Sequence, residues 1–301
     1  MKPRMKPRPK HSEPLIAAPV TGLTAGANPI SIRSSGATLT GALFMPDTPP
    51  VAAIVLHGAV GVPAGYYRAF ATWLATQGCA CLTYDYRDFG ASQTAHLRRS
   101  TASLQVWGLS DQPAALGALR DHLPGVPVWV IGHSLGGTML GFHPMDGVAR
   151  VITVASGLVT LADHPWPYRA FAAWFWHGLP RLATAVLRYL PGRLLRMGPD
   201  LPSGVYRQWR RWCLRPGFWQ GDVGHTLPAP DPARIRCAMK IVAIADDVVV
   251  PPVAVWRLMA LYPRATKRQL TLRPADHGLR SIGHIAAFSR ANAVVWPAII
   301  A

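Results

Sequence analysis

The chain has 301 residues, enough to bury a sizeable core, and half of them are apolar while 15% are charged. This composition excludes a disordered chain. The 31 Lys and Arg residues outnumber the 14 Asp and Glu residues, which gives a formal net charge of +17. Such a charge favours anionic partners in general, but no nucleic-acid-binding motif accompanies it, so we predict no nucleic-acid partner.

The chain has four cysteines: Cys79, Cys81, Cys213 and Cys237. They are too few and too scattered for a disulfide framework, and their spacing is not that of a zinc site. We therefore expect free thiols in a reducing compartment, no metal and no cofactor. The basic N-terminal stretch lacks the apolar core of a secretory signal, and no apolar run suits a bilayer-spanning helix. We expect a cytoplasmic protein.

The N-terminal part of the chain, residues 1–28, is basic and contains proline and glycine, so we predict a flexible tail. Two short runs follow, Ile30–Arg33 and Thr38–Phe44, in which polar and apolar residues are interleaved. This pattern is typical of strands with one buried face, and it predicts a leading antiparallel hairpin.

Beyond the hairpin, continuous apolar runs alternate with helical periodicity. Such runs, of which Val51–Leu56 is the clearest, are typical of strands buried on both faces of a sheet. Strands are predicted at Val51–Leu56, Cys79–Tyr84, Val126–Ile131, Val148–Val154, Lys240–Ala245 and Arg268–Leu272. Helices are predicted at Tyr66–Gln77, at Ala102–His122 with a kink at Pro113, at Ser134–Gly141, near Val253–Leu261 and after His284. The alternation predicts an α/β fold with a mostly parallel central sheet flanked by helices.

Residues 157–222, here called the cap segment, break this alternation and contain six tryptophans. With helical periodicity at Leu182–Leu190, they predict a helical cap inserted into a core made of residues 29–156 and 223–301. Its tryptophans would form apolar walls for a substrate, and arginines such as Arg210 and Arg211 would hold an anionic end. Alternatively, the tryptophans pack the core of the cap itself.

The central motif of the chain is Gly132-His133-Ser134-Leu135-Gly136, which matches G-x-S-x-G. It follows an apolar strand and opens a predicted helix, the setting of a nucleophile elbow. A sharp turn there lifts the serine hydroxyl above the sheet, and both glycines allow close approach of neighbouring backbone. The motif predicts Ser134 as a nucleophile. The alternative is an ordinary glycine-rich turn with a capping serine.

A serine nucleophile needs a histidine base and an acid that orients the histidine. In this fold the chain order is serine, acid, histidine. Asp247 is the preferred acid because it follows a strand end and the chain has begun to turn there, and Asp246 is the second choice. His284, preceded by a glycine, is the preferred base, and His277 is the second choice. The alternatives are turn aspartates and a surface histidine.

An oxyanion hole requires two backbone N–H groups aimed at one point. The residue after the nucleophile, Leu135, should provide one of them. The loop after Leu56 should provide the second, and we predict the N–H of Ala59. His57 either braces this loop or acts as a base, although it precedes the serine.

Five motifs resemble the α/β-hydrolase superfamily in their order along the chain: LHGAVGV, LTYDYRDFGAS, GHSLGG, ADDVVVPP and IGH. They are most similar to bacterial predicted hydrolases near the serine aminopeptidase and monoacylglycerol lipase-like branch, over residues 30 to 292. This resemblance implies the α/β-hydrolase fold, with Ser134, Asp247 and His284 as triad and Ala59 and Leu135 as oxyanion donors. The group's usual Tyr-Arg-Gly is Tyr86-Arg87-Asp88 here, which makes the conformation of that loop an open question.

These observations together predict a serine hydrolase that cleaves a carboxylic ester through an acyl-enzyme, with amides and thioesters as less favoured substrates. The expected substrate is a small molecule with an apolar acyl part and, as an option, an anionic end. Two alternatives remain open: an acyltransferase that uses the same triad, and a non-catalytic ligand-binding protein of the same fold. Contact of the basic, apolar cap with an anionic membrane surface is a further hypothesis.

Overall fold

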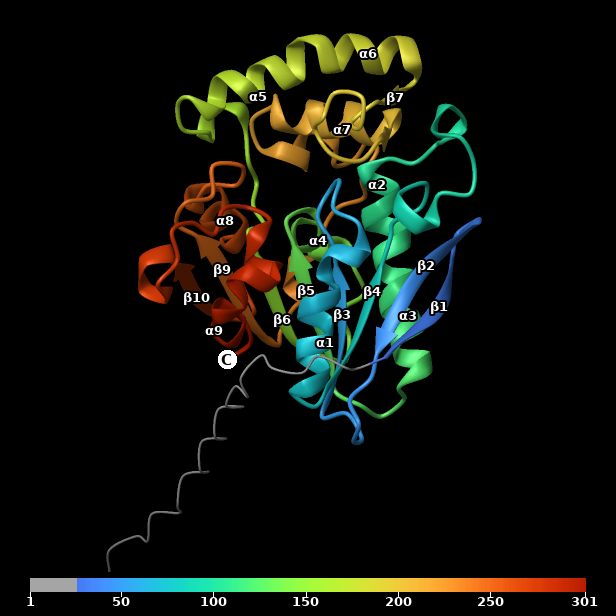
Figure 1. The fold of residues 1–301 in the computed structure, drawn as a ribbon, viewed down its shortest axis with the longest axis vertical. Helices are drawn as coiled ribbons and strands as arrows, with labels where there is room; N and C mark the ends of the chain where they lie inside the picture. Colours follow the sequence, from blue (N-terminus) through green and yellow to red (C-terminus); the bar gives the residue numbers. More distant parts are fainter. Residues whose placement is uncertain (1–25) are drawn as a thin grey trace, which may run out of the picture.

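The computed structural model describes residues 26–301 (Figure 1). Nearly all of the predicted tail, residues 1–28, lies outside the described residues. The first strand begins at Ala27, so the predicted start of the core at residue 29 is two residues late. No helix among the described residues combines the length and the apolar character needed to cross a membrane.

The fold is built on one eight-stranded sheet with the strand order β1-β2-β4-β3-β5-β6-β9-β10. Its strands are β1 (Ala27–Ser34), β2 (Ala37–Phe44), β3 (Ala52–His57), β4 (Cys79–Tyr84), β5 (Val128–His133), β6 (Val148–Val154), β9 (Ala238–Ile244) and β10 (Thr266–Leu272). The β1–β2 hairpin and the β2–β4 pair are antiparallel, and all other pairs are parallel. The predicted hairpin and mostly parallel sheet are confirmed.

Helices cover both faces of the sheet, because alternate strand residues point to opposite sides. On one face, α1 (Arg68–Thr76) and α9 (Trp296–Ile300) pack on a cluster that includes Ile54 of β3. On the other face, α3 (Gln112–His122) and α8 (Pro252–Met259) pack on a cluster that includes Val55. Strand β3 is therefore buried on both faces, which accounts for its continuous apolar sequence.

The predicted helix Ala102–His122 is divided into α2 (Leu104–Val106), a π-helical turn at Trp107–Asp111, and α3. Pro113 lies in the first turn of α3, where its missing N–H costs no helical hydrogen bond. The break in helical geometry is thus the π-helical turn before the proline.

The predicted helix Ser134–Gly141 is wrong in length. The structure has one α-helical turn, α4 (Leu135–Thr138), followed by a 3₁₀ turn at Leu140–Phe142. The chain then becomes extended at His143, with φ −99° and ψ 152°. Pro144 explains the extended conformation of His143, because a proline disfavours helical geometry in the residue before it.

Short 3₁₀ helices connect the larger elements, and two of them take the place of the start of the predicted last helix after His284. They lie at Ala64–Tyr67, Gly90–Ser92, Leu97–Arg99, Leu161–Asp163, Phe218–Asp222, Pro232–Arg234, Pro274–His277, Ala286–Phe288 and Arg290–Val295.

The cap segment lies between β6 and β9 and forms a layer above the sheet (Figure 1). Its elements are α5 (Tyr168–His177), α6 (Leu179–Leu187), β7 (Tyr189–Leu190), β8 (Leu201–Pro202) and α7 (Ser203–Cys213). The helical periodicity at Leu182–Leu190 extends beyond the observed end of α6 at Leu187. The helix ends there because Arg188 adopts the left-handed conformation, with φ 63°.

The loop after β4 answers the question raised by the missing glycine. Asp88 has a φ of 58°, so it adopts the left-handed conformation that glycine would favour. The Ser100 hydroxyl donates to its carboxylate at 2.6 Å. Aspartate tolerates this region better than most residues, and the hydroxyl gives its side chain a fixed partner.

Candidate active site

The turn that carries Ser134 has the geometry of a nucleophile elbow. β5 ends at His133, and Ser134 has φ 53° and ψ −117°, a conformation that is strained for a residue with a side chain. A Cβ at Gly132 would overlap the backbone of Gly137, and one at Gly136 would overlap the carbonyl of His57. Both motif glycines are therefore required by close backbone contacts.

A chain of hydrogen bonds joins the three residues favoured by the sequence pattern. His284 Nε2 lies 3.0 Å from Ser134 Oγ, and His284 Nδ1 lies 2.7 Å from Asp247 Oδ2. The side chain of Asp247 is fully buried, and that of His284 is 10% exposed. These contacts are possible because the turns after β5 and β9 and the loop after β10 meet at one edge of the parallel sheet.

The other oxygen of Asp247 fixes its orientation. Oδ1 accepts hydrogen bonds from the backbone N–H groups of Val249 at 2.8 Å and Val250 at 2.9 Å. The carboxylate therefore has one oxygen for its own loop and one for His284. This division holds the histidine with Nδ1 toward the acid and Nε2 toward the serine.

The second-choice residues do not take part in this hydrogen-bonded chain. Asp246 accepts hydrogen bonds from the N–H groups of Ile282 at 2.9 Å and Gly283 at 3.1 Å, so it braces the loop that precedes His284. His277 lies in the 3₁₀ helix Pro274–His277 and forms no hydrogen bond with the serine or either aspartate.

Of the two roles considered for His57, a brace for its loop or a base, the contacts favour the brace. Its ring is fully buried, and Nδ1 lies 2.7 Å from the hydroxyl of Tyr84. Burial, with a smaller contribution from His143, lowers the pKa of His57 well below its ordinary value. A ring with so low an affinity for a proton, and with no hydrogen bond to Ser134, is not the base for it.

The second residue of the G-x-S-x-G motif, His133, links the elbow to the histidine loop. Its Nε2 lies 3.0 Å from the backbone carbonyl oxygen of His284. A carbonyl only accepts, so Nε2 carries the proton. Burial first, and then the proximity of His284, lower the pKa of His133 to about 3, so the ring is neutral near pH 7. Its Nδ1 must then accept, and the Tyr67 hydroxyl donates to it at 2.8 Å.

The Tyr67 hydroxyl in turn accepts a hydrogen bond from the N–H of Ala59 at 2.9 Å. The prediction that Ala59 supplies a free oxyanion donor therefore disagrees with the structure, in which a tyrosine hydroxyl occupies that donor. Among residues 26–301, the N–H groups of Val60 and Leu135 have no acceptor. Both residues line the cavity at Ser134, whereas Ala59 is 2% exposed and does not.

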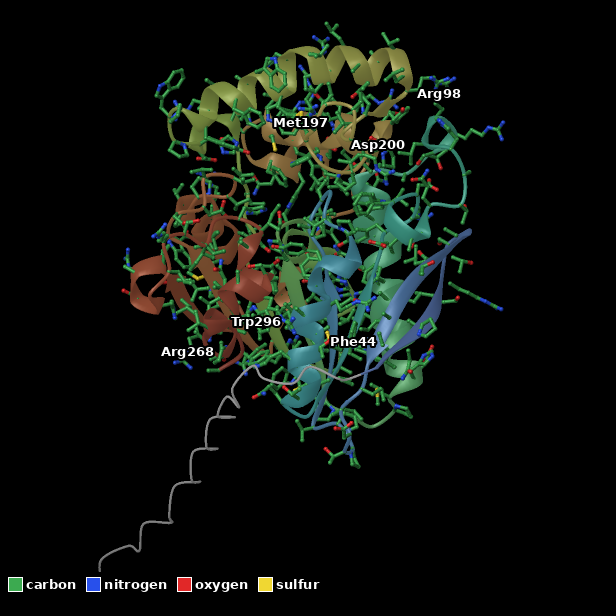
Figure 2. The ribbon with its side chains drawn as sticks, in the orientation of Figure 1. Phe44, Arg98, Met197, Asp200, Arg268 and Trp296 are labelled. Atoms are coloured by element: carbon green, nitrogen blue, oxygen red, sulfur yellow. The ribbon has the colours of Figure 1, made fainter. Side chains whose placement is uncertain are left out.

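A cavity of about 500 Å³ opens at Ser134 and His284. Its roof comes from the cap segment and is largely aromatic, with Phe171, Trp174, Phe175, Trp176 and Trp209, together with Met197. Figure 2 shows Met197 in the layer above the sheet. The volume suits a small organic ligand, and the lining suits an apolar one.

Five of the six tryptophans of the cap segment serve one or other of the roles considered from the sequence, and the sixth, Trp166, is 76% exposed. Trp174, Trp176 and Trp209 line the cavity, whereas Trp212 and Trp219 are buried in the core. The arginines differ from the expectation. Arg196 is the only arginine in the lining of this cavity, while Arg210 and Arg211 line a separate one.

The cysteines are all free, and three of the four are buried. Burial raises the pKa of the Cys79 thiol to about 11, which leaves it protonated near neutral pH. Within residues 26–301, no group of three or more His, Cys, Asp or Glu side chains is arranged to hold a metal ion.

Comparison with known proteins gives a consistent fold assignment. A model of the alpha/beta hydrolase family matches residues 53–295. The structure is similar to an esterase of Pyrococcus furiosus, with a TM-score of 0.58 and 14% identity over 92% of this chain and 89% of that chain. It is also similar to a monoacylglycerol lipase of Paleococcus ferrophilus, with a TM-score of 0.55 and 18% identity over 87% of this chain and 96% of that one. No curated protein matches the sequence.

Proposed function

The chain belongs to the alpha/beta hydrolase family, and we propose that it is a serine esterase that acts through a covalent acyl-enzyme. The observation that carries the proposal is the hydrogen-bonded chain from Ser134 through His284 to the buried Asp247, with distances of 3.0 and 2.7 Å. These distances match the reach required between a nucleophile, a general base and its orienting acid.

In the proposed reaction, Ser134 Oγ attacks the ester carbonyl carbon while His284 Nε2 takes the hydroxyl proton. Asp247 stabilises the imidazolium that results. Collapse of the tetrahedral intermediate breaks the bond to the alcohol oxygen, and His284 protonates the leaving alcohol. Water, deprotonated by the same histidine, then attacks the acyl-enzyme and releases the carboxylic acid.

The oxyanion formed in each step needs two donors, and we assign them to Leu135 and Val60. Both N–H groups lack an acceptor among the described residues, and both residues border the cavity beside Ser134. This assignment replaces Ala59, whose N–H is engaged by Tyr67. Donors of this kind typically contribute about 2.7–4 kcal/mol each to stabilising the transition state.

The substrate we propose is a small ester with an apolar acyl group. The aromatic roof formed by Trp174, Trp176 and Trp209 favours such a group. Arg196 is the one cavity arginine that could meet an anionic end. Amides and thioesters use the same chemistry, and transfer to an acceptor other than water would use the same residues.

A series of p-nitrophenyl esters of increasing acyl length, measured beside Ser134→Ala, tests this proposal. We expect turnover of the wild type, a preference for acyl chains longer than acetyl, and loss of turnover in the variant. Amide and thioester analogues of the best ester identify the preferred bond, and added alcohols test for acyl transfer. Turnover that survives Ser134→Ala would contradict the proposal.

We also propose that the outer face of α6 contacts an anionic lipid surface. Leu179, Leu182 and Val186 follow helical spacing and are 52%, 61% and 80% exposed, and the chain carries a net charge of +17. Co-sedimentation with vesicles tests this, with Leu182→Asp/Val186→Asp as the variant. Equal binding of the wild type and the variant would refute the contact.

The subcellular site that we propose is the cytoplasm or another reducing compartment. The support is chemical, because the chain keeps four free cysteines, three of them buried. An oxidising compartment would expose such thiols to pairing during folding.

A further inference from the structure

A second cavity, of about 600 Å³, lies between the cap segment and the loop that carries Arg98 and Ser100, and many of its lining residues are arginines. Seven of its lining residues are arginines, and none is an aspartate or glutamate: Arg98, Arg181, Arg188, Arg207, Arg210, Arg211 and Arg215. We call this the arginine cavity. Its polar lining also includes the hydroxyl residues Ser100, Thr184, Ser203 and Tyr206.

Few of these arginines are neutralised. Arg211 forms an ion pair with Asp222. Among the described residues, the other six have no carboxylate partner within ion-pair distance. Like charges gathered in one concave site repel one another, so the excess positive charge is a cost unless an anion offsets it.

Some of the arginines are held in place by neutral acceptors. Arg98 Nε donates to the carbonyl of Leu187 at 3.2 Å, which ties this residue to the end of α6 (Figure 2). Arg210 Nε donates to the carbonyl of Trp176, and an Arg207 nitrogen donates to the Ser203 hydroxyl at 3.2 Å. These bonds orient the stems but use only a fraction of the five N–H donors of each guanidinium.

The arginine cavity is distinct from the cavity at Ser134, because the two have no lining residue in common. Helix α7 separates them. Trp209 and Cys213 of α7 line the serine cavity, while Arg207, Arg210 and Arg211 of the same helix line the arginine cavity. A ligand of the arginine cavity therefore occupies a different site from the acyl group of the proposed ester.

We propose that the arginine cavity binds a ligand that bears phosphoryl groups and at least two negative charges. Planar guanidinium groups bind phosphate oxygens through paired hydrogen bonds, which is why arginine predominates in such sites. The volume exceeds that of a single phosphate and suits a pyrophosphate, a phosphorylated small molecule or a phospholipid headgroup. The arginines come from three segments, at Arg98, on and just after α6, and on and just after α7, so the ligand would bridge these segments.

Binding can be measured with inorganic pyrophosphate by calorimetry and by the shift in thermal unfolding. The test variant is Arg181→Gln/Arg207→Gln/Arg215→Gln, whose residues belong to the cavity and to no ion pair. The control is Arg33→Gln/Arg264→Gln/Arg290→Gln, which removes the same charge from exposed positions outside the cavity. Both triple variants have the same net charge, so a difference between them reports the site and not the overall field.

We expect the wild type and the control to bind pyrophosphate with similar affinity, and the test variant to bind at least roughly tenfold more weakly. The single variants Arg181→Gln and Arg215→Gln, expected to lose affinity by several-fold each, replace the triple variant if it does not fold. Equal losses in the two triple variants, or no binding by the wild type, would overturn the proposal.

A vesicle arm separates the two sources of the phosphoryl group. Vesicles of phosphatidylcholine with phosphatidic acid are sedimented with each protein, with and without pyrophosphate. If a lipid headgroup is the ligand, only the test variant loses binding and pyrophosphate competes for the site. If a soluble phosphate compound is the ligand, the two triple variants bind vesicles equally, while only the test variant loses affinity for pyrophosphate. These measurements are independent of ester hydrolysis, so they stand even if the proposed function fails.

Discussion

His133 Nε2 donates a hydrogen bond of 3.0 Å to the backbone carbonyl of His284, so the residue before the nucleophile holds the loop of the proposed base. The same ring accepts from the Tyr67 hydroxyl, which accepts from the Ala59 N–H. Three segments that surround Ser134 are thus connected through one buried, neutral imidazole. The proposed reaction requires each of these segments to hold its position relative to the other two.

Tyr67→Phe removes the hydroxyl at the centre of this connection. It leaves the Ala59 N–H and His133 Nδ1 without partners, and we expect about 1–3 kcal/mol of lost stability. We also expect kcat for ester hydrolysis to fall by roughly tenfold or more with little change in KM, because positioning of His284 is disturbed. Tyr84→Phe is the matched control, since it removes a buried hydroxyl from another histidine, His57, at 2.7 Å, and leaves the bonds of His133 and His284 intact. Similar kinetics in both variants would refute the positioning role of Tyr67.

The strain at the elbow predicts a stability difference between two variants that lack the Ser134 hydroxyl. Ser134 has a φ of 53°, which glycine adopts readily and alanine does not. We expect Ser134→Gly to be more stable than Ser134→Ala by about 1 kcal/mol, after the greater unfolded-state entropy of glycine has reduced the gain. Denaturant unfolding measures both. An alanine variant as stable as the glycine variant would show that the turn stores no strain.

Substitutions of the adjacent residues Asp247 and Asp246 should differ in their effects on kcat. Asp247→Asn removes the carboxylate that faces His284 Nδ1, and kcat should fall by on the order of 10³–10⁴. Asp246→Asn weakens the bonds to Ile282 and Gly283, and we expect a loss in kcat within about tenfold together with reduced stability. Steady-state kinetics on one ester compares them. A larger kinetic effect at Asp246 would reverse the assignment.

Buried histidines predict instability at acid pH. Burial lowers the pKa of His133 to about 3 and that of His143 to about 4, and it lowers the pKa of His57 as well. The unfolded chain therefore binds more protons than the folded one below about pH 6.5. The contribution of these neutral rings to the free energy of unfolding is fully present above that pH. It decreases as the pH drops toward 4, by up to about 1.4 kcal/mol per pH unit for each ring.

Urea unfolding at pH 7, 6 and 5 checks this prediction. The free energy of unfolding should decrease at each step. His143→Gln, which is outside the proposed site, should decrease less steeply because one titrating ring is gone. A free energy that stays constant over this range would contradict the burial of neutral rings.

Much of the fold could be predicted from the sequence because its signals are local. The apolar run at Cys79–Tyr84 coincides with β4, and the interleaved residues of the first two runs form the antiparallel hairpin. The length of the helix after Ser134 could not be taken from apolar periodicity alone. Pro144 signals the extended chain at His143, but it does not account for the end of α4 at Thr138.

The site was less accessible from the sequence, for a physical reason. The G-x-S-x-G motif nominates Ser134, and chain order with strand ends narrows the acid to Asp246 or Asp247 and the base to His277 or His284, since parallel strands bring their carboxyl ends together. The use of the Ala59 N–H by Tyr67 depends on how the 3₁₀ helix Ala64–Tyr67 packs against the loop after β3, and no local pattern encodes that distance. The gathering of Arg98 with arginines of α6 and α7 likewise depends on the packing of distant segments.

The most direct test of the central claim is covalent labelling with a fluorophosphonate, followed by mass spectrometry of the labelled peptide. We predict a single adduct on Ser134, formed by the wild type, slowed strongly in His284→Ala and absent in Ser134→Ala. An adduct on another residue, or labelling of the wild type no faster than that of His284→Ala, would contradict a serine activated by the histidine that lies 3.0 Å away.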